Sequence, residues 1–350
     1  CRLGDGPQEF EEGPGEEGEE LLEAANVRGI LADSSSETWS LGTGLTLFSG
    51  RSSFGVSVGY YDTLYGVPLA PGAGHHHEEE DHDEDEEEEE EVVRIDLDQV
   101  RLNIAGELSN PLPGFQNAKL QYLDSDYEHI ELEGDEVGTV FEIDARSLRG
   151  QLDHNTVSFI GGELSGVAGI HLRDREFSAV GEEAFVPEVD TKSHALFVVE
   201  KLEIGSAKYE AGLRVEQVDH EASGANPDRD FTATSLSLGT RQVLTEGVSL
   251  SAQVAFSERA PAAEELYSNG PHIATESFEL GDDDLDKEQA LSVDIGFNVE
   301  HGRMRGSLNV FYTDYDGYIY QQFQDNDNDG VADEEDELTI LQYEQDEAEF

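Results

Sequence analysis

The chain has 350 residues, of which 37% are hydrophobic, and its 80 acidic and 20 basic residues give a formal net charge of −60 at pH 7. So negative a surface repels phosphates, which excludes nucleic acid and anionic lipid headgroups as partners. The small apolar fraction does not favour a compact soluble core. This balance of charges is typical of a protein in high salt, where screening relieves the repulsion between carboxylates.

The start of the chain and its single cysteine say little about the class of protein. No stretch approaches the ~18 apolar residues of a membrane-spanning helix, and the first thirty residues lack the pattern of a signal peptide. Cys1 has no second cysteine with which to form an internal disulfide. It is either a lipidated mature terminus or the point at which a longer chain was cut, and we expect the second.

Period-two alternation is the clearest pattern in the chain, and it predicts strands because a strand sends successive side chains to opposite faces. Between Leu291 and Val299 every second residue is apolar, and those between are polar or glycine. Similar stretches predict thirteen strands near residues 37–48, 53–65, 92–108, 117–130, 138–152, 156–173, 192–204, 207–220, 230–244, 248–257, 288–300, 303–316 and from 338 onward.

The predicted connections alternate between short and long. Short turns fall at Gly50, 110–114, 153–155, 205–206, 246–247 and 301–302, and long loops at 66–91, 131–137, 174–191, 221–229, 258–287 and 317–337. This is the pattern of an all-β, antiparallel transmembrane β-barrel with short periplasmic turns and long outer loops. Lipid would then cover the apolar face, and the polar face would line a wet lumen.

The domain organisation follows from the strand pattern. We expect residues 1–36 to be the end of an extracellular loop and residues 37–350 to be part of a barrel. Bacterial single-chain barrels close with an even number of strands, so thirteen strands indicate a fragment.

A motif near the middle of the chain resembles the barrel of TonB-dependent outer-membrane receptors. The matching residues form the pattern S-x-R-A-P-x-x-x-E-L-Y, the following N-G-P, and the later G-x-x-x-L-x-x-E: Ser257, Arg259, Ala260, Pro261, Glu265, Leu266, Tyr267, Asn269, Gly270, Pro271, Gly281, Leu285 and Glu288. Within the family the chain looks most like the zinc-uptake receptors with a His-rich outer loop. The plug domain and its TonB box are not in this sequence.

The resemblance implies an outer-membrane receptor of a Gram-negative bacterium for energised uptake of a scarce nutrient, most similar to zinc importers. It further implies outer-membrane lipid, the TonB complex and a small ligand or metal ion as partners, with the receptor a monomer. Two alternatives stay open: a receptor of the same class for a siderophore, haem or cobalamin, and a non-transporting calcium-binding surface barrel.

The loop at 66–91 carries the first candidate metal site. Imidazoles beside carboxylates suit zinc, and clustered negative charge attracts divalent cations. The candidate ligands are His75, His76, His77, His82, Glu78 and Asp81. The glutamate run that follows, up to Glu91, is expected to be a solvated charge run.

His272 in the loop 258–287 is a second candidate zinc ligand, with Glu264, Glu265 or Glu276 as its carboxylate partner. His129, beside Glu128 and Glu131 at a strand end, is a weaker candidate.

The segment 325–336 fits a calcium-loop template. Asp325, Asp327, Asp329, Asp333 and Asp336 occupy positions 1, 3, 5, 9 and 12, Gly330 occupies position 6, and Val331 offers its carbonyl at position 7. Position 12 is Asp instead of the longer Glu, and no helical pattern flanks the loop. A structural calcium ion and an unoccupied acidic turn are both open.

Enzymatic chemistry has no support in the sequence. No nucleophile motif, phosphate-binding glycine loop or dinucleotide fingerprint is present. We therefore expect a receptor and not an enzyme.

Overall fold

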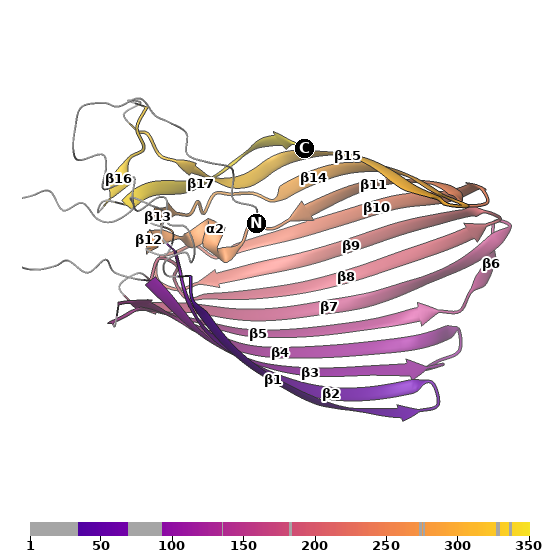
Figure 1. The fold of residues 1–350 in the computed structure, drawn as a ribbon, viewed down its shortest axis with the longest axis horizontal. Helices are drawn as coiled ribbons and strands as arrows, with labels where there is room; N and C mark the ends of the chain where they lie inside the picture. The colour runs from indigo at the N-terminus through magenta and orange to yellow at the C-terminus, as the bar shows by residue number, and fades with distance from the viewer. Residues whose placement is uncertain are drawn as a thin grey trace, which may run out of the picture.

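The computed structural model describes residues 34–68, 93–134, 136–181, 184–272, 275, 277–326, 330–335 and 338–350. The strands in these ranges form one strongly curved sheet (Figure 1). The long strands are β1 (Ser36–Ser49), β2 (Ser52–Gly66), β3 (Val93–Ser109), β4 (Phe115–Glu133), β5 (Glu136–His154), β7 (Gly162–Gly181), β8 (Val189–Ile204), β9 (Ala207–Ala222), β10 (Arg229–Thr245), β11 (Val248–Arg259), β14 (Glu288–His301), β15 (Met304–Phe323) and β17 (Leu338–Glu349).

Four further strands are short, which brings the number in the described ranges to 17, where the alternation predicts thirteen. They are β6 (Val157–Phe159), β12 (Asn269–His272), β13 (Ser277–Leu280) and β16 (Glu334–Glu335), and one helix, α2 (Ala263–Tyr267), precedes β12. The strand predicted at 156–173 includes β6, and the structure divides it at residues 160–161. The alternation misses the other three, because segments of two to four residues are too short to show a period. No helix in the described ranges is long and apolar enough to cross a membrane.

Each long strand pairs antiparallel with the next long strand, as expected for a barrel wall. The one parallel pairing recorded joins β13 to β17. Among the described strands β1 pairs with β2 alone, so the wall has an open edge there.

Several predicted long loops are shorter than expected. The loop predicted at 131–137 is wrong, because β4 reaches Glu133 and β5 begins at Glu136. Strand β7 extends to Gly181 and β15 to Phe323, which shortens the loops predicted at 174–191 and 317–337. These outer strand ends carry charged side chains, which hide their strand character from an apolar pattern. The loop predicted at 66–91 lies mostly outside the described ranges.

The outer face of the wall changes from apolar to charged along each strand. On the hydrogen-bonded neighbours β7, β8 and β9, the aligned outer-face residues Ile170, Leu196 and Val215 are apolar, and four residues closer to the outer loops the aligned residues are Asp174, Lys192 and Asp219. A transmembrane strand needs only ~9–11 residues. Because β7 has 20, its charged outer end projects beyond the apolar belt.

The opposite, lumenal face is largely polar, and its outer end is covered by the segment 260–287, which carries α2, β12 and β13. These short elements gather at one end of the sheet, and the short turn near β6 lies at the other (Figure 1). The sequence places 258–287 in an outer loop, and the structure shows that this connection packs on the wall: α2 contacts Val189 of β8 and Phe231 of β10. We call residues 260–287 the fold-back segment.

Arginine substitutions at two neighbouring positions of β11 test the assignment of the faces. Val254 lies in the apolar row of the outer face, and Gln253 points to the lumen opposite Asp294. We expect Val254→Arg to lower the free energy of unfolding in a lipid bilayer by about 2 kcal/mol, because a charge in the apolar belt is poorly solvated. Gln253→Arg should leave it within about 0.5 kcal/mol. Denaturant titration of the receptor in vesicles measures both, and equal losses would show that the faces are assigned wrongly.

Candidate functional site

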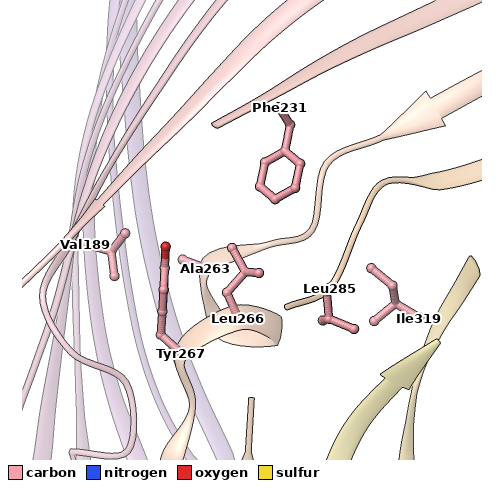
Figure 2. Close-up of a cluster of buried hydrophobic side chains, with 7 residues drawn as sticks. All are labelled: Val189, Phe231, Ala263, Leu266, Tyr267, Leu285 and Ile319. Atoms are coloured by element: carbon pink, nitrogen blue, oxygen red, sulfur yellow. The ribbon is translucent and has the colours of Figure 1, made fainter. Parts of the chain in front are cut away.

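The candidate site lies where the fold-back segment meets the lumenal wall. Helix α2 places Leu266 and Tyr267 in a buried apolar cluster that also includes side chains of the wall strands β8, β10 and β15 (Figure 2). The Tyr267 hydroxyl donates a hydrogen bond to the Pro227 carbonyl at 2.9 Å. Burial raises the pKa of Tyr267 to about 12, so this hydroxyl stays protonated and remains a donor. The cluster consists of Val189, Phe231, Ala263, Leu266, Tyr267, Leu285 and Ile319.

Two polar contacts hold the start of the fold-back segment to the wall. Arg175 Nη2 of β7 lies 2.7 Å from Glu264 Oε1 of α2. Buried His220, in β9 beyond the apolar belt, bonds the Pro261 carbonyl through Nε2 at 3.2 Å and the Thr191 hydroxyl through Nδ1 at 2.9 Å. A carbonyl only accepts, so Nε2 is the protonated nitrogen and Nδ1 accepts from Thr191. Burial lowers the pKa of His220, which favours this neutral form.

His272 and Glu279 form an imidazole–carboxylate pair on the hairpin β12–β13. The Nδ1 of His272 lies 2.9 Å from Glu279 Oε1, and the Glu279 side chain is only 8% exposed. The ring of His272 stacks on Phe185 at 4.6 Å between centroids and 20° between planes. A carboxylate is an acceptor, so Nδ1 is the donor in this hydrogen bond, and in the neutral tautomer Nε2 carries the lone pair. A metal-binding histidine is commonly oriented in this way by a carboxylate on its other nitrogen.

His129 and Glu131 form a second such pair, on β4 of the wall. His129 Nε2 lies 3.8 Å from Glu131 Oε1, and the Glu131 side chain is 6% exposed. The Nδ1 of His129 is buried and has no hydrogen-bond partner in the described ranges. Partial burial and the nearby Glu131 charge raise the pKa of Tyr65, at the outer end of β2. The Glu131 carboxyl and an imidazole nitrogen that lacks a hydrogen-bond partner in the described ranges are therefore both buried on β4.

Two phenylalanines join the pairs. His129 stacks on Phe141 at 4.5 Å, Phe141 lies 6.1 Å from Phe185, and Phe185 stacks on His272. Where the chain is described, the four histidine and glutamate side chains do not bring three ligand atoms within 4.8 Å of one another; the group that does is Asp282, Asp283 and Asp284, in a mostly exposed turn. Each pair thus offers a partial coordination shell.

The sequence-predicted site residues divide into those placed and those not. His75, His76, His77, His82, Glu78 and Asp81 lie outside the described residues, as do Asp327, Asp329 and Asp336 of the calcium-type loop. His272 is placed in β12, where Glu279 is its carboxylate partner; Glu276, one of the three partners expected, lies outside the described residues. Glu264 and Glu265 instead form ion pairs with arginines.

The described part of the calcium-type loop is a closed turn. Asp325 Oδ2 accepts a hydrogen bond from the Gly330 amide at 3.1 Å. Asp333 Oδ2 accepts from the backbone and side-chain nitrogens of Asn326 at 2.9 and 2.7 Å. Both carboxylates therefore accept hydrogen bonds from described residues of this loop, and Val331 lies between them in sequence.

Sequence reasoning missed Glu279, Phe141 and Phe185. Glu279 interrupts an apolar pair, Phe278 and Leu280, and a charged residue at such a position is a signal for a buried polar role. Phe141 and Phe185 carry no such signal, because the contact between them joins distant parts of the chain.

The motif residues of the sequence form one connected structure around α2. Arg259 Nη1 lies 2.8 Å from Glu265 Oε2, and Arg259 Nη2 lies 3.3 Å from Glu288 Oε2. Leu266, Tyr267 and Leu285 are in the buried cluster, and Pro261 is bonded to His220. The spacing of the motif therefore reflects the geometry of the fold-back segment.

Solved structures of similar fold are receptors and transporters. The chain resembles a double mutant of the Serratia marcescens hemophore receptor HasR in complex with its hemophore HasA and heme (TM-score 0.65, 15% identity, covering 90% of this chain and 50% of that one). It also resembles the siderophore receptor PirA from Pseudomonas aeruginosa (TM-score 0.63, 16% identity, covering 90% of this chain and 52% of that one). A third similar structure is the copper transporter OprC (TM-score 0.66, 13% identity, covering 91% of this chain and 50% of that one). The chain spans about half the length of these proteins.

The family comparison confirms the resemblance seen in the sequence. A family model described as "TonB dependent receptor-like, beta-barrel" matches residues 25–349, nearly the whole chain. Together with the antiparallel wall, this match confirms the predicted fold class. The chain therefore belongs to the TonB dependent receptor-like β-barrel family, and its place is the outer membrane of a Gram-negative bacterium.

Proposed function

We propose that this chain is part of the barrel of a receptor that takes up zinc by TonB-dependent transport. The observation that carries the proposal is the His272–Glu279 pair, whose carboxylate orients the imidazole and leaves Nε2 available to a metal ion. Zinc prefers nitrogen ligands supplemented by carboxylate oxygen, and both occur in each of the two pairs. We expect no catalysis, because the family and the similar structures are receptors and transporters.

An incomplete coordination shell suits an ion that must leave again. A structural zinc site has four protein ligands, whereas these pairs offer fewer: Nε2 alone at His272, and Nε2 of His129 together with Glu131. The His-rich loop would capture the ion first, and the two pairs would receive it at the outer end of the lumen. Passage through the membrane would require the TonB complex acting through a plug domain.

Haem and siderophores are the alternative cargo, because HasR is in complex with heme and its hemophore and PirA is a siderophore receptor. A non-transporting calcium-binding barrel is a weaker alternative, since the fold-back site contributes nothing to it.

Replacing His272 tests the cargo site. In the intact receptor, His272→Ala should weaken zinc binding at least tenfold, and Glu279→Gln about tenfold, because the amide is a poorer acceptor for Nδ1–H. The matched control is His301→Ala, because His301 is the last residue of β14 and lies at the end of that strand away from the site. Calorimetric titration with zinc and, separately, with hemin reads out the cargo. If hemin binds and zinc does not, haem is the cargo.

The His-rich loop has its own test. Replacing His75, His76, His77 and His82 together by Ala should remove a zinc-binding event from the calorimetric titration. In the unmodified receptor that event should weaken below roughly pH 6, because protonated imidazole does not bind metal. Glutamine substitutions in the run Glu86–Glu91 serve as the control and should change the affinity little. Unchanged affinity in the histidine variant would remove the loop from the mechanism.

The calcium-type loop should respond to calcium as a structural element. Five aspartates around Gly330 repel one another unless a hard cation joins them, and we expect weak affinity, on the order of 10⁻⁴ to 10⁻³ M. Proteolysis within residues 320–337 should slow when calcium is added and recover with chelator. Asp327→Ala and Asp329→Ala should abolish this protection, whereas Asp282→Ala, in the other acidic turn, should keep it. Equal cleavage rates with and without calcium would eliminate the site.

A further inference from the structure

Arg259 links two carboxylates that belong to different elements. Its guanidinium lies between Glu265, in α2, and Glu288, the first residue of β14. The two carboxylate side chains are 16% and 14% exposed, so water screens these ion pairs less than pairs on an open surface. We call Arg259, Glu265 and Glu288 the clamp.

Both carboxylates of the clamp also accept backbone hydrogen bonds. Glu265 Oε2 accepts from the Ala262 amide at 2.6 Å, which caps the start of α2. Glu288 Oε2 accepts from the Ile319 amide of β15 at 3.2 Å. The clamp therefore fixes α2 relative to the strands β11, β14 and β15.

Helix α2 in turn holds both ends of the hairpin β12–β13. Strand β12 begins two residues after the helix, and after β13 the Gly281 amide donates to the Ser268 carbonyl at 2.6 Å. The next amide, of Asp282, donates to the Glu265 carbonyl at 3.0 Å. Since the hairpin is closed at its base by the clamped helix, a movement of α2 moves the hairpin with it.

Close packing leaves the hairpin little room to adjust. A Cβ added at Gly270 would lie 3.1 Å from Cα and Cβ of Phe185, and one added at Gly281 would lie 2.7 Å from backbone atoms of Leu266 and Ser268. The Asn269 amide also donates to the Phe185 carbonyl at 2.6 Å. The backbone of the hairpin is therefore in direct contact with the residue on which His272 stacks.

We propose that the clamp is a positioning device for the metal site: Arg259, Glu265 and Glu288 set the location of His272 and Glu279 relative to His129 and Glu131 without touching the cargo. The inference rests on the proposed function. Binding geometry must be held within about 0.5 Å by supporting residues. Loosening the clamp should therefore weaken cargo binding from a distance.

Conservative substitutions in the clamp distinguish positioning of the metal site from a simple effect of charge. Lysine keeps the positive charge of Arg259, but one ammonium group lacks the planar fork that reaches two carboxylates. Glu265→Gln keeps an oxygen for the Ala262 amide while removing the charge. Arg241→Lys is the matched control, because Arg241 is a lumenal arginine of β10 that donates to the Ser249 hydroxyl at 3.4 Å.

The experiment uses the intact receptor in detergent with two probes, zinc by calorimetry and Co²⁺ by its visible absorption spectrum, which reports the ligands around the ion. We expect Arg259→Lys and Glu265→Gln to weaken zinc binding about tenfold and to alter the Co²⁺ spectrum, whereas Arg241→Lys changes neither. Thermal unfolding of each variant is measured in parallel.

Three results would overturn the proposal, and they differ from one another. If the clamp variants unfold at lower temperature but keep the wild-type Co²⁺ spectrum and zinc affinity, the clamp is only structural. If both clamp variants match wild type in every measurement while His272→Ala loses zinc, the positioning role fails and the zinc site stands. If His272→Ala also binds zinc normally, the proposed function itself fails.

Discussion

The backbone hydrogen bonds of a membrane-spanning segment must be satisfied within the protein, because lipid offers neither donors nor acceptors. The meander meets this constraint by pairing every long strand with its successor. Once the backbone is paired in this way, side chains alternate between the two faces, and each face is free to match its surroundings. Because the backbone is paired in this way, the outer face can carry apolar rows while the lumenal face is polar. The candidate site lies on that polar face.

The site depends on a different kind of order from the wall. The wall is built from neighbouring strands with a repeating pattern, whereas the fold-back segment is held by individual contacts: Arg175 with Glu264, His220 with Pro261, and Arg259 with two carboxylates. Partly buried ion pairs and buried imidazoles gain their stability only when every partner is in place. The motif residues recognised in the sequence are the ones that supply these partners.

The alternation predicts the thirteen long strands and the tight turns well, because a period of two repeats many times along each strand. It fails where the chain forms α2, β12 and β13, since five helical and four strand residues show no period. His272 stands out from its sequence as a rare residue type in a long connection, but its partner Glu279 and the ring of Phe185 are brought to it by tertiary contacts alone. For the same reason, the spacing of residues in the sequence does not predict the row of aromatic contacts from His129 through Phe141 and Phe185 to His272.

The fold-back segment also has a consequence for the wall that carries it. Five pairs of neighbouring long strands are joined by two-residue turns, but β11 and β14 are joined by 28 residues, and the entropy of closing a loop grows with the logarithm of its length. Closing this connection costs about 2 kcal/mol more than closing a two-residue turn. Burial of apolar side chains in the cluster around α2 offsets that cost and holds the connection on the wall. The pairing of β11 with β14 therefore depends on side chains that belong to neither strand.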